Sequence, residues 1–322
     1  MRSFPIPLVI VVAVVAAVAT ACTANAQEEE MKLKAIRYLS SADDTQQPAM
    51  FHAPRSDEPV PLLVVLHTWS GGYRQNYHAG CEAWAMKKGW VVIRPNFRGP
   101  NNKPDACGSE LAVADILSAV EYAKSAAKVD AKRVYLVGAS GGGHAALLLA
   151  GRAPKVWAGV SAWVPVSDLA AWYDECTKRK LNYANDIVKC CGGVPGASPE
   201  VDEQYRRRSP VTWLKDARDL PLDINAGISD GHTGSVPIRH ALRAFNVVAE
   251  KEDRISDADI AHMTDKAEVP PQLAADVVDQ SYGAKKPLFR RTSGKARVTI
   301  FRGGHEIVES AAMTWLEKQV KE

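Results

Sequence analysis

The chain has 322 residues, with 40 basic and 37 acidic side chains and a formal net charge of +3. Hydrophobic residues make up 46% and charged residues 24%, which is ordinary for one large α/β domain or two small ones. This charge balance, without basic runs interleaved with aromatic residues, excludes the electrostatic signature of a nucleic-acid-binding protein.

The N-terminus departs from that composition. An apolar run from Ile6 to Val18 is followed by Ala24-Asn25-Ala26, which fits the small-x-small rule for signal-peptide cleavage before Gln27. The sequence therefore predicts a signal peptide over residues 1–26 and export to the periplasm or the extracellular space. The run is short for a membrane span, which needs about 20 residues. An uncleaved anchor and a lipoprotein attached through Cys22 are the alternatives.

Cysteine spacing leaves the redox state open. The mature chain would hold five cysteines, Cys81, Cys107, Cys176, Cys190 and Cys191. In an exported protein Cys81 could pair with Cys107, and Cys176 with Cys190 or Cys191, leaving one thiol over. Buried reduced thiols are the alternative. No C-x-x-C spacing indicates zinc or a redox dithiol, and we expect neither metal nor cofactor.

Short apolar segments bounded by Gly or Pro alternate with helix-period segments from about residue 60 onward, which predicts a mostly parallel, twisted sheet with helices on both faces. The expected strands are Leu62–Leu66, Trp90–Ile93, Arg133–Val137, Trp157–Val164, Leu222–Ala226 and Arg297–Phe301, after an antiparallel hairpin within residues 30–55. The expected helices include Val113–Val120, Ala145–Ala150 and a closing helix from Glu306 to Lys321.

Two stretches, at about residues 168–220 and 250–295, do not follow this alternation. Ser256-Asp257-Ala258-Asp259 within the second resembles a capped helix start with an acidic first turn. We expect both stretches to be insertions at the C-terminal edge of the sheet, where loops usually shape a ligand site.

Gly138-Ala139-Ser140-Gly141-Gly142 is a G-x-S-x-G motif between an apolar strand and an apolar helix. Such a turn holds the serine in a strained conformation with its hydroxyl exposed at a helix N-terminus, and it requires small neighbours. The alternative is a glycine-rich helix entry without a catalytic role. The sequence therefore predicts that Ser140 is a nucleophile.

A serine nucleophile needs a base and an acid, which in this arrangement follow in the order Ser, Asp or Glu, His. Asp230 follows the strand that ends near Gly227, and His305 follows the last strand. We therefore predict Asp230 as the acid and His305 as the general base. Asp223 lies inside a strand, and Glu306 is predicted to open the closing helix, so both are poorer acids.

An oxyanion hole needs two N–H donors. The sequence predicts the backbone of Gly141 as one and that of Trp69 as the other, with Thr68 as the rival. The Trp69 indole is expected either to line the acyl pocket or to pack in a glycine-rich turn. Thr68 and His232 are candidates for substrate contact.

Other polar residues have structural interpretations. His144 is expected to pack behind the motif, and Asn96 and Arg98 to brace the loop beneath the site. Arg206-Arg207-Arg208 is most simply a solvated helix face, the alternative being a site for an acidic substrate such as a uronic acid.

Taken together, several segments resemble the catalytic domain of the prolyl oligopeptidase family. They are His67–Gly72, Asn96-Phe97-Arg98-Gly99, Asp115, Val129-Asp130, Gly138–Gly142, Pro165–Leu169, Ser209-Pro210, Gly227–Asp230, Val236-Pro237 and Gly304-His305. The resemblance implies a single α/β-hydrolase domain over residues 27–322. The family's peptidases carry a β-propeller, for which the roughly 35 mature residues before the core leave no room. Stand-alone relatives of this domain are often acetyl or feruloyl esterases.

The resulting hypothesis is a secreted carboxylic-ester hydrolase that forms an acyl-enzyme on Ser140. Its substrate would be a small-molecule or saccharide ester, with no nucleic-acid partner, no stable membrane span after signal cleavage and no cofactor. The alternative is a serine peptidase of prolyl oligopeptidase type that acts on short peptides. A catalytically silent binding protein is a third hypothesis, which the intact Ser, Asp and His disfavour.

Overall fold

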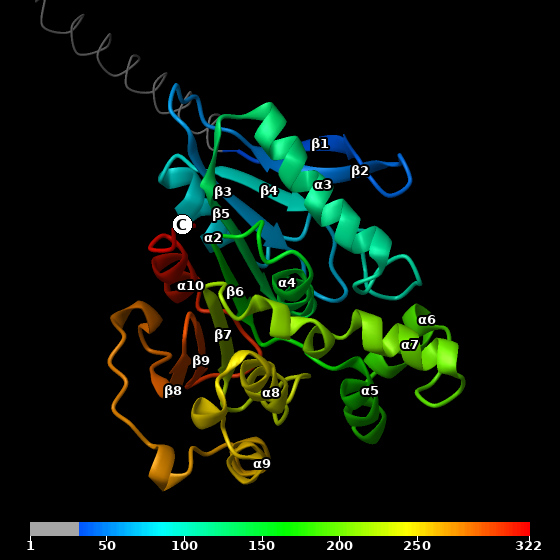
Figure 1. The fold of residues 1–322 in the computed structure, drawn as a ribbon, viewed down its shortest axis with the longest axis vertical. Helices are drawn as coiled ribbons and strands as arrows, with labels where there is room; N and C mark the ends of the chain where they lie inside the picture. Colours follow the sequence, from blue (N-terminus) through cyan, green and yellow to red (C-terminus); the bar gives the residue numbers. More distant parts are fainter. Residues whose placement is uncertain (1–31) are drawn as a thin grey trace, which may run out of the picture.

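The computed structural model describes residues 32–322, so the predicted signal peptide and Cys22 lie outside the described residues. A nine-stranded sheet in the order β1-β2-β4-β3-β5-β6-β7-β9-β8 runs through this part of the chain (Figure 1). The strands are β1 Lys34–Leu39, β2 Gln46–His52, β3 Val60–Leu66, β4 Val91–Pro95, β5 Val129–Ala139, β6 Gly159–Trp163, β7 Leu222–Gly227, β8 Pro287–Ser293 and β9 Ala296–Phe301.

The centre of the sheet is parallel. Strands β4, β3, β5, β6, β7 and β9 pair in parallel, whereas the β1–β2 hairpin adds antiparallel pairs at one edge and β8 adds one at the other. The predicted mostly parallel sheet and its N-terminal hairpin are thus confirmed. The carboxyl ends of β3, β5, β7 and β9 consequently meet along one edge of the sheet.

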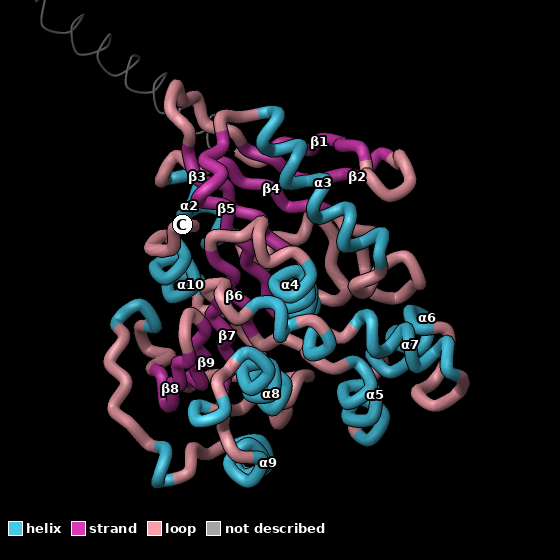
Figure 2. Tube along the Cα trace, viewed as in Figure 1, coloured by secondary structure: helices cyan, strands magenta, loops and turns pink. Residues whose placement is uncertain are grey.

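Helices cover both faces of this sheet (Figure 2). The helices are α2 Ala79–Lys87, α3 Glu110–Ala126, α4 Gly141–Arg152, α5 Leu169–Lys178, α6 Tyr183–Cys191, α7 Pro199–Arg208, α8 Arg239–Val248, α9 Asp257–Lys266 and α10 Glu309–Leu316. Along β3, Leu62, Val64 and Leu66 join the core beneath α3, α4 and α8, whereas Leu63 and Val65 join the core beneath α2 and α10. This alternation is expected of a strand that is buried on both faces. Within residues 32–322 none of the helices has the length and apolar character needed to cross a membrane.

The two irregular stretches contain helices of their own. The first holds α5, α6 and α7, which pack around an aromatic and cysteine-rich cluster separate from the main core. The second holds α9, whose N-cap Ser256 accepts a hydrogen bond from the amide of Asp259, as the acidic start of that segment predicts.

The closing helix is shorter than predicted. It begins at Glu309 rather than Glu306 and ends at Leu316. The Glu306 carboxylate accepts hydrogen bonds from the Gly304 amide, at 3.1 Å, and from the Lys285 ammonium, at 2.8 Å. These contacts hold residues 303–306 in a loop, so the segment that carries His305 is not helical.

All five cysteines within residues 32–322 are free thiols, so neither disulfide expected from the spacing is present. Cys81 packs in the core beneath α2 and α10, whereas Cys107 packs in the separate cluster formed by the first insertion. The Cys107 thiol contacts Cys190, and burial raises its pKa well above the ordinary value. Separation along the chain did not reveal which thiols are neighbours in space.

A buried ion pair joins α2 to β4. The Glu82 carboxylate lies 2.8 Å from the Arg94 guanidinium, and both side chains are almost fully buried. Burial raises the pKa of Glu82 to about 7, although Arg94 acts in the opposite direction. Ionisation of the Glu82 carboxyl therefore requires more free energy in the folded protein than in the unfolded chain.

This difference predicts a pH-dependent change in stability. Because the folded pKa of Glu82 exceeds the unfolded one, wild-type protein loses stability relative to Glu82→Gln as pH rises from about 4.5 to about 7, by about 1–3 kcal/mol. Urea unfolding of both proteins between pH 4.5 and pH 8 measures the difference. Parallel stability curves, or a wild type that gains on the variant as pH rises, would contradict this expectation.

Candidate active site

Ser140 occupies the sharp turn between β5 and α4. Its backbone has φ 57° and ψ −120°, a conformation that L-residues rarely adopt and that costs about 1–3 kcal/mol. The turn is anchored by the Ser140 amide, which donates to the Trp163 carbonyl of β6 at 2.9 Å. A Cβ atom on Gly142 would lie 2.4 Å from the Leu66 carbonyl oxygen of β3, which explains why the motif needs a small residue there.

Asp230 and His305 come together at the same edge of the sheet. The Asp230 Oδ2 atom lies 2.7 Å from His305 Nδ1, although the two residues are 75 positions apart. The other carboxylate oxygen accepts hydrogen bonds from the amides of Gly231, at 2.9 Å, and Val236, at 3.2 Å. Asp230 is buried. The two amides hold Oδ1, and Oδ2 therefore faces the imidazole ring.

The His305 loop is held in place by neighbouring segments. The Tyr77 hydroxyl, from the β3–α2 connection, donates to the His305 carbonyl at 3.3 Å. The side chain of Glu306 is engaged with Lys285 and the Gly304 amide. Glu306 therefore does not compete with Asp230 for the ring.

Within residues 32–322, the structure contains no hydrogen bond between the Ser140 hydroxyl and the His305 ring. The two residues follow β5 and β9, whose carboxyl ends lie at the same edge of the sheet. In enzymes without substrate such contacts are often long and tighten only when substrate binds. The structure thus pairs Asp230 with His305 and brings Ser140 to the same edge of the sheet.

Two backbone N–H groups lie beside the serine turn. A Cβ atom on Gly141 would lie 2.4 Å from the Trp69 backbone nitrogen, so these two residues pack backbone against backbone. Neither amide has a hydrogen-bond acceptor within the described residues. The Thr68 amide, the rival donor, is already bound to Gln75 Oε1 at 2.9 Å. Trp69 is therefore the better second donor for an oxyanion hole.

The Trp69 side chain is packed rather than open to solvent. Its indole is 2% exposed and meets Trp172 edge-to-face, with 4.7 Å between ring centroids. Tyr183 of α6 stacks on Trp172 at 5.2 Å. The indole of Trp69 thus belongs to the cluster that supports the first insertion, as the packing interpretation predicts.

The side chains of the remaining predicted residues have partners other than Ser140, Asp230 and His305. His144 is buried and hydrogen-bonded to the Arg208 carbonyl, and burial lowers its pKa to about 4, which fits a packing role. His232 faces α9, with Nε2 2.8 Å from the Thr264 carbonyl oxygen. Asp223 pairs with Arg297 at 2.7 Å inside the sheet.

The three consecutive arginines are not one solvated face. Arg206 pairs with Glu203, and Arg207 pairs with Glu110. Arg208, in contrast, is buried and donates to the backbone carbonyls of Pro104, Ala106 and Cys107. The surface interpretation is therefore wrong for Arg208, because the loop before α3 leaves carbonyl groups that only this side chain reaches.

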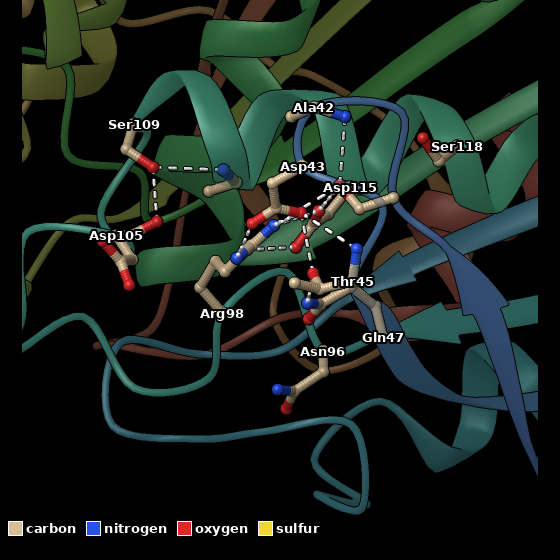
Figure 3. A network of polar contacts seen from close by, with 12 residues as sticks. Ala42, Asp43, Thr45, Gln47, Asn96, Arg98, Asp105, Ser109, Asp115 and Ser118 are labelled. Atoms are coloured by element: carbon tan, nitrogen blue, oxygen red, sulfur yellow. Dashed lines mark hydrogen bonds and ion pairs between the residues drawn. The ribbon is translucent and has the colours of Figure 1, made fainter.

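Arg98 braces the loop after β4 against α3 and the β1–β2 turn (Figure 3). Its guanidinium binds both oxygens of Asp115 on α3, at 2.7 and 3.0 Å, and both oxygens of Asp43 in the β1–β2 turn, at 2.8 and 2.9 Å. The Ser40 hydroxyl also donates to Asp115 at 2.5 Å. Asp115 is fully buried, so these partners take the place of the water that would otherwise contact its carboxylate.

Asp115→Asn is expected to lower the free energy of unfolding by about 3 kcal/mol, because it leaves a buried guanidinium with half of its pairing. Glu121→Ala on the same helix is the matched control, since Glu121 forms an exposed pair with Lys124 that contributes about 0.3–0.5 kcal/mol. Chemical denaturation measures both. Equal effects of the two substitutions would show that the buried network contributes no more than a surface ion pair.

Comparison with known proteins places the site in a family context. The model of the prolyl oligopeptidase family matches residues 81–262, which is more than half of the chain. The "Dipeptidyl peptidase family member 6" of Caenorhabditis elegans is 27% identical over 53% of this chain and 24% of its own length. The "Acylamino-acid-releasing enzyme 1" of Oryza sativa subsp. japonica is 23% identical over 60% of this chain and 28% of its own length. The chain thus spans about a quarter of each relative.

Solved structures share the fold. A puromycin hydrolase aligns with a TM-score of 0.59 and 18% identity over 89% of this chain and 38% of its own. The acylaminoacyl peptidase of Pyrococcus horikoshii aligns with a TM-score of 0.53 and 19% identity over 67% of this chain and 34% of its own. Both likenesses concern the α/β-hydrolase fold alone.

Sequence reasoning missed the role of Gly234. A Cβ atom at this position would lie 2.2 Å from Asp230 Oδ1 and 2.5 Å from His305 Cβ. The absence of a side chain is therefore what allows the acid and the base to meet. Only its position four residues after Asp230 offered a signal, and a single glycine in a polar loop is common.

Proposed function

Since the chain belongs to the prolyl oligopeptidase family, we propose that it is a serine peptidase that cleaves short peptides through an acyl-enzyme on Ser140. The observation that carries this proposal is the 2.7 Å contact between Asp230 and His305. The contact forms at the edge of the sheet that also carries the strained turn of Ser140. A histidine oriented by a buried carboxylate is the base that a serine nucleophile requires.

In the proposed reaction the Ser140 oxygen attacks the carbonyl carbon of the peptide bond while His305 Nε2 takes the hydroxyl proton. The C–N bond then breaks, and His305 returns the proton to the leaving amine. Asp230 keeps the proton on Nδ1, so that Nε2 is free to act, and stabilises the imidazolium. Water then attacks the acyl carbon while His305 takes its proton. His305 returns this proton to the Ser140 oxygen as the ester bond breaks, which releases the carboxylic acid.

The amides of Gly141 and Trp69 would stabilise the negative oxygen of the tetrahedral intermediate. Both are backbone donors held by packing of the two segments against each other, so little reorganisation is needed when charge develops. The position of Ser140 at the N-terminus of α4 adds a favourable dipole.

The choice between peptides and esters rests on the relatives. The sequence alone favoured carboxylic esters, with peptides as the alternative. The named relatives are a dipeptidyl peptidase and an acylamino-acid-releasing enzyme, which supports peptides as the substrate class. Ester hydrolysis uses the same residues, so the distinction lies in the substrate rather than in the triad.

Matched substrates would test this proposal. Aminoacyl and N-acylaminoacyl p-nitroanilides would be compared with p-nitrophenyl esters of the same acyl groups, and with acetyl and feruloyl esters, using purified protein and Ser140→Ala as the blank. We expect amide cleavage with kcat/KM of at least about 10⁴ M⁻¹ s⁻¹, the lower end of the usual enzymatic range. Cleavage of esters alone would overturn the peptidase assignment in favour of the esterase.

A further inference from the structure

The orientation of the Asp230 carboxylate depends on the loop formed by residues 231–236. This loop turns around the carboxylate, so that the amides at its two ends, Gly231 and Val236, both donate to Oδ1. The remaining oxygen, Oδ2, is thereby directed at His305. If the loop shifts, the acid shifts with it.

Helix α5 holds this loop from outside. Arg179, at the C-terminal end of α5, donates from its guanidinium to the Gly234 carbonyl at 2.6 Å and to the Ser235 carbonyl at 3.3 Å. The indole of Trp172, two turns earlier on α5, donates to the same Ser235 carbonyl at 3.1 Å. Three donors from the first insertion therefore converge on two consecutive carbonyl groups of the loop.

Gly234 is the point at which this contact reaches the active site. Its backbone packs directly against Asp230 Oδ1 and His305 Cβ. The carbonyl held by Arg179 thus belongs to the residue that packs against both members of the pair. A displacement of this carbonyl would move backbone that touches both side chains.

We propose that Arg179 is a positioning residue for the Asp230–His305 pair, acting through the carbonyl groups of Gly234 and Ser235. The inference rests on the proposed function, because it assigns Arg179 to the orientation of that triad. It would also give the first insertion a role in catalysis, since α5 leads into the arginine that holds the acid loop.

The side chain of Arg179 is exposed, so its contribution to global stability is small, whereas its effect on the loop is local. A charged donor bound to neutral carbonyls forms a strong hydrogen bond. An error of about 1 Å in a catalytic group can cost about 100-fold in rate. Arg179 also lines an open cavity of about 350 Å³, together with Gly231 and His232. Its removal would leave the two carbonyl groups without their cationic donor.

The test compares Arg179→Ala and Arg179→Lys with Arg206→Ala, a surface arginine of the same insertion that pairs with Glu203. With the best substrate of the panel, we expect Arg179→Ala to lower kcat by about 10-fold to 100-fold at nearly unchanged KM. Arg179→Lys should recover part of the rate. Guanidinium chloride at tens of millimolar, well below denaturing concentrations, should raise kcat of Arg179→Ala but not of wild type. Arg206→Ala should match wild type.

The outcomes separate two kinds of failure. If Ser140→Ala retains wild-type activity, the proposed function fails, and the role of Arg179 fails with it. If Ser140→Ala is inactive but Arg179→Ala keeps the wild-type kcat, only the positioning role is overturned. A rise in KM at constant kcat, or a loss of activity that tracks a fall in thermal stability with no guanidinium rescue, would also overturn it.

Discussion

Replacing His305 by alanine is expected to lower kcat by about 10⁴-fold to 10⁶-fold. Without the imidazole, no group takes the proton from the Ser140 hydroxyl, and the leaving amine departs without a proton. Asp230→Asn should cost about 10⁴-fold, because an amide favours the wrong tautomer of the ring. Steady-state kinetics on the preferred amide or ester measures both effects.

His262→Ala is the matched control for the loss of an imidazole, since His262 lies on α9, outside the acid loop, and its Nε2 has no hydrogen-bond partner within residues 32–322. We expect it to remain within a few-fold of wild type. The effects of the triad should not add, so Ser140→Ala combined with His305→Ala should be no slower than the slower single variant. A His305→Ala enzyme with more than a tenth of the wild-type rate would exclude His305 as the base.

Gly234→Ala is expected to reduce kcat by about 100-fold or more without unfolding the protein. The added methyl group would lie 2.2 Å from Asp230 Oδ1 and 2.5 Å from His305 Cβ, distances far shorter than any van der Waals contact. The loop must therefore move away, and it carries the Asp230 carboxylate with it. Kinetics together with circular dichroism separates this local displacement from a loss of fold.

Gly193→Ala is the matched glycine control. Its added methyl group would approach a methyl group of Val201 at 3.1 Å, and that side chain can yield by a small amount. We expect Gly193→Ala to keep nearly all activity. Comparable losses in the two variants would mean that any glycine replacement in these loops is harmful, and the specific role of Gly234 would be lost.

The central part of the fold could be predicted because its signal is local. Buried parallel strands read as short apolar runs, and the serine turn carries its own motif between two such runs. A pairing of Asp230 with His305 could be predicted because both residues follow strands whose carboxyl ends lie at the same edge of the sheet. Their contact distance, in contrast, required the three-dimensional structure.

The features that were missed depend on contacts between distant segments. The hydrogen bond from Arg179 to the Gly234 carbonyl joins the first insertion to a loop 55 residues away. Neither segment alone indicates this contact. The possible disulfides are absent from residues 32–322, where Cys107 contacts Cys190 and Cys81 lies in a different cluster. The closing helix was placed too early because Glu306 is engaged by Lys285 and by the Gly304 amide instead of starting a helix.

Covalent labelling with a fluorophosphonate, followed by peptide mass spectrometry, tests the proposed nucleophile most directly. The phosphonyl group should add once per wild-type molecule, on Ser140, with loss of fluoride. It should be absent from Ser140→Ala and slow to form in His305→Ala. A wild-type protein that hydrolyses its substrate but carries no adduct, or carries it on another residue, would contradict the assignment of Ser140 and the proposed function built on it.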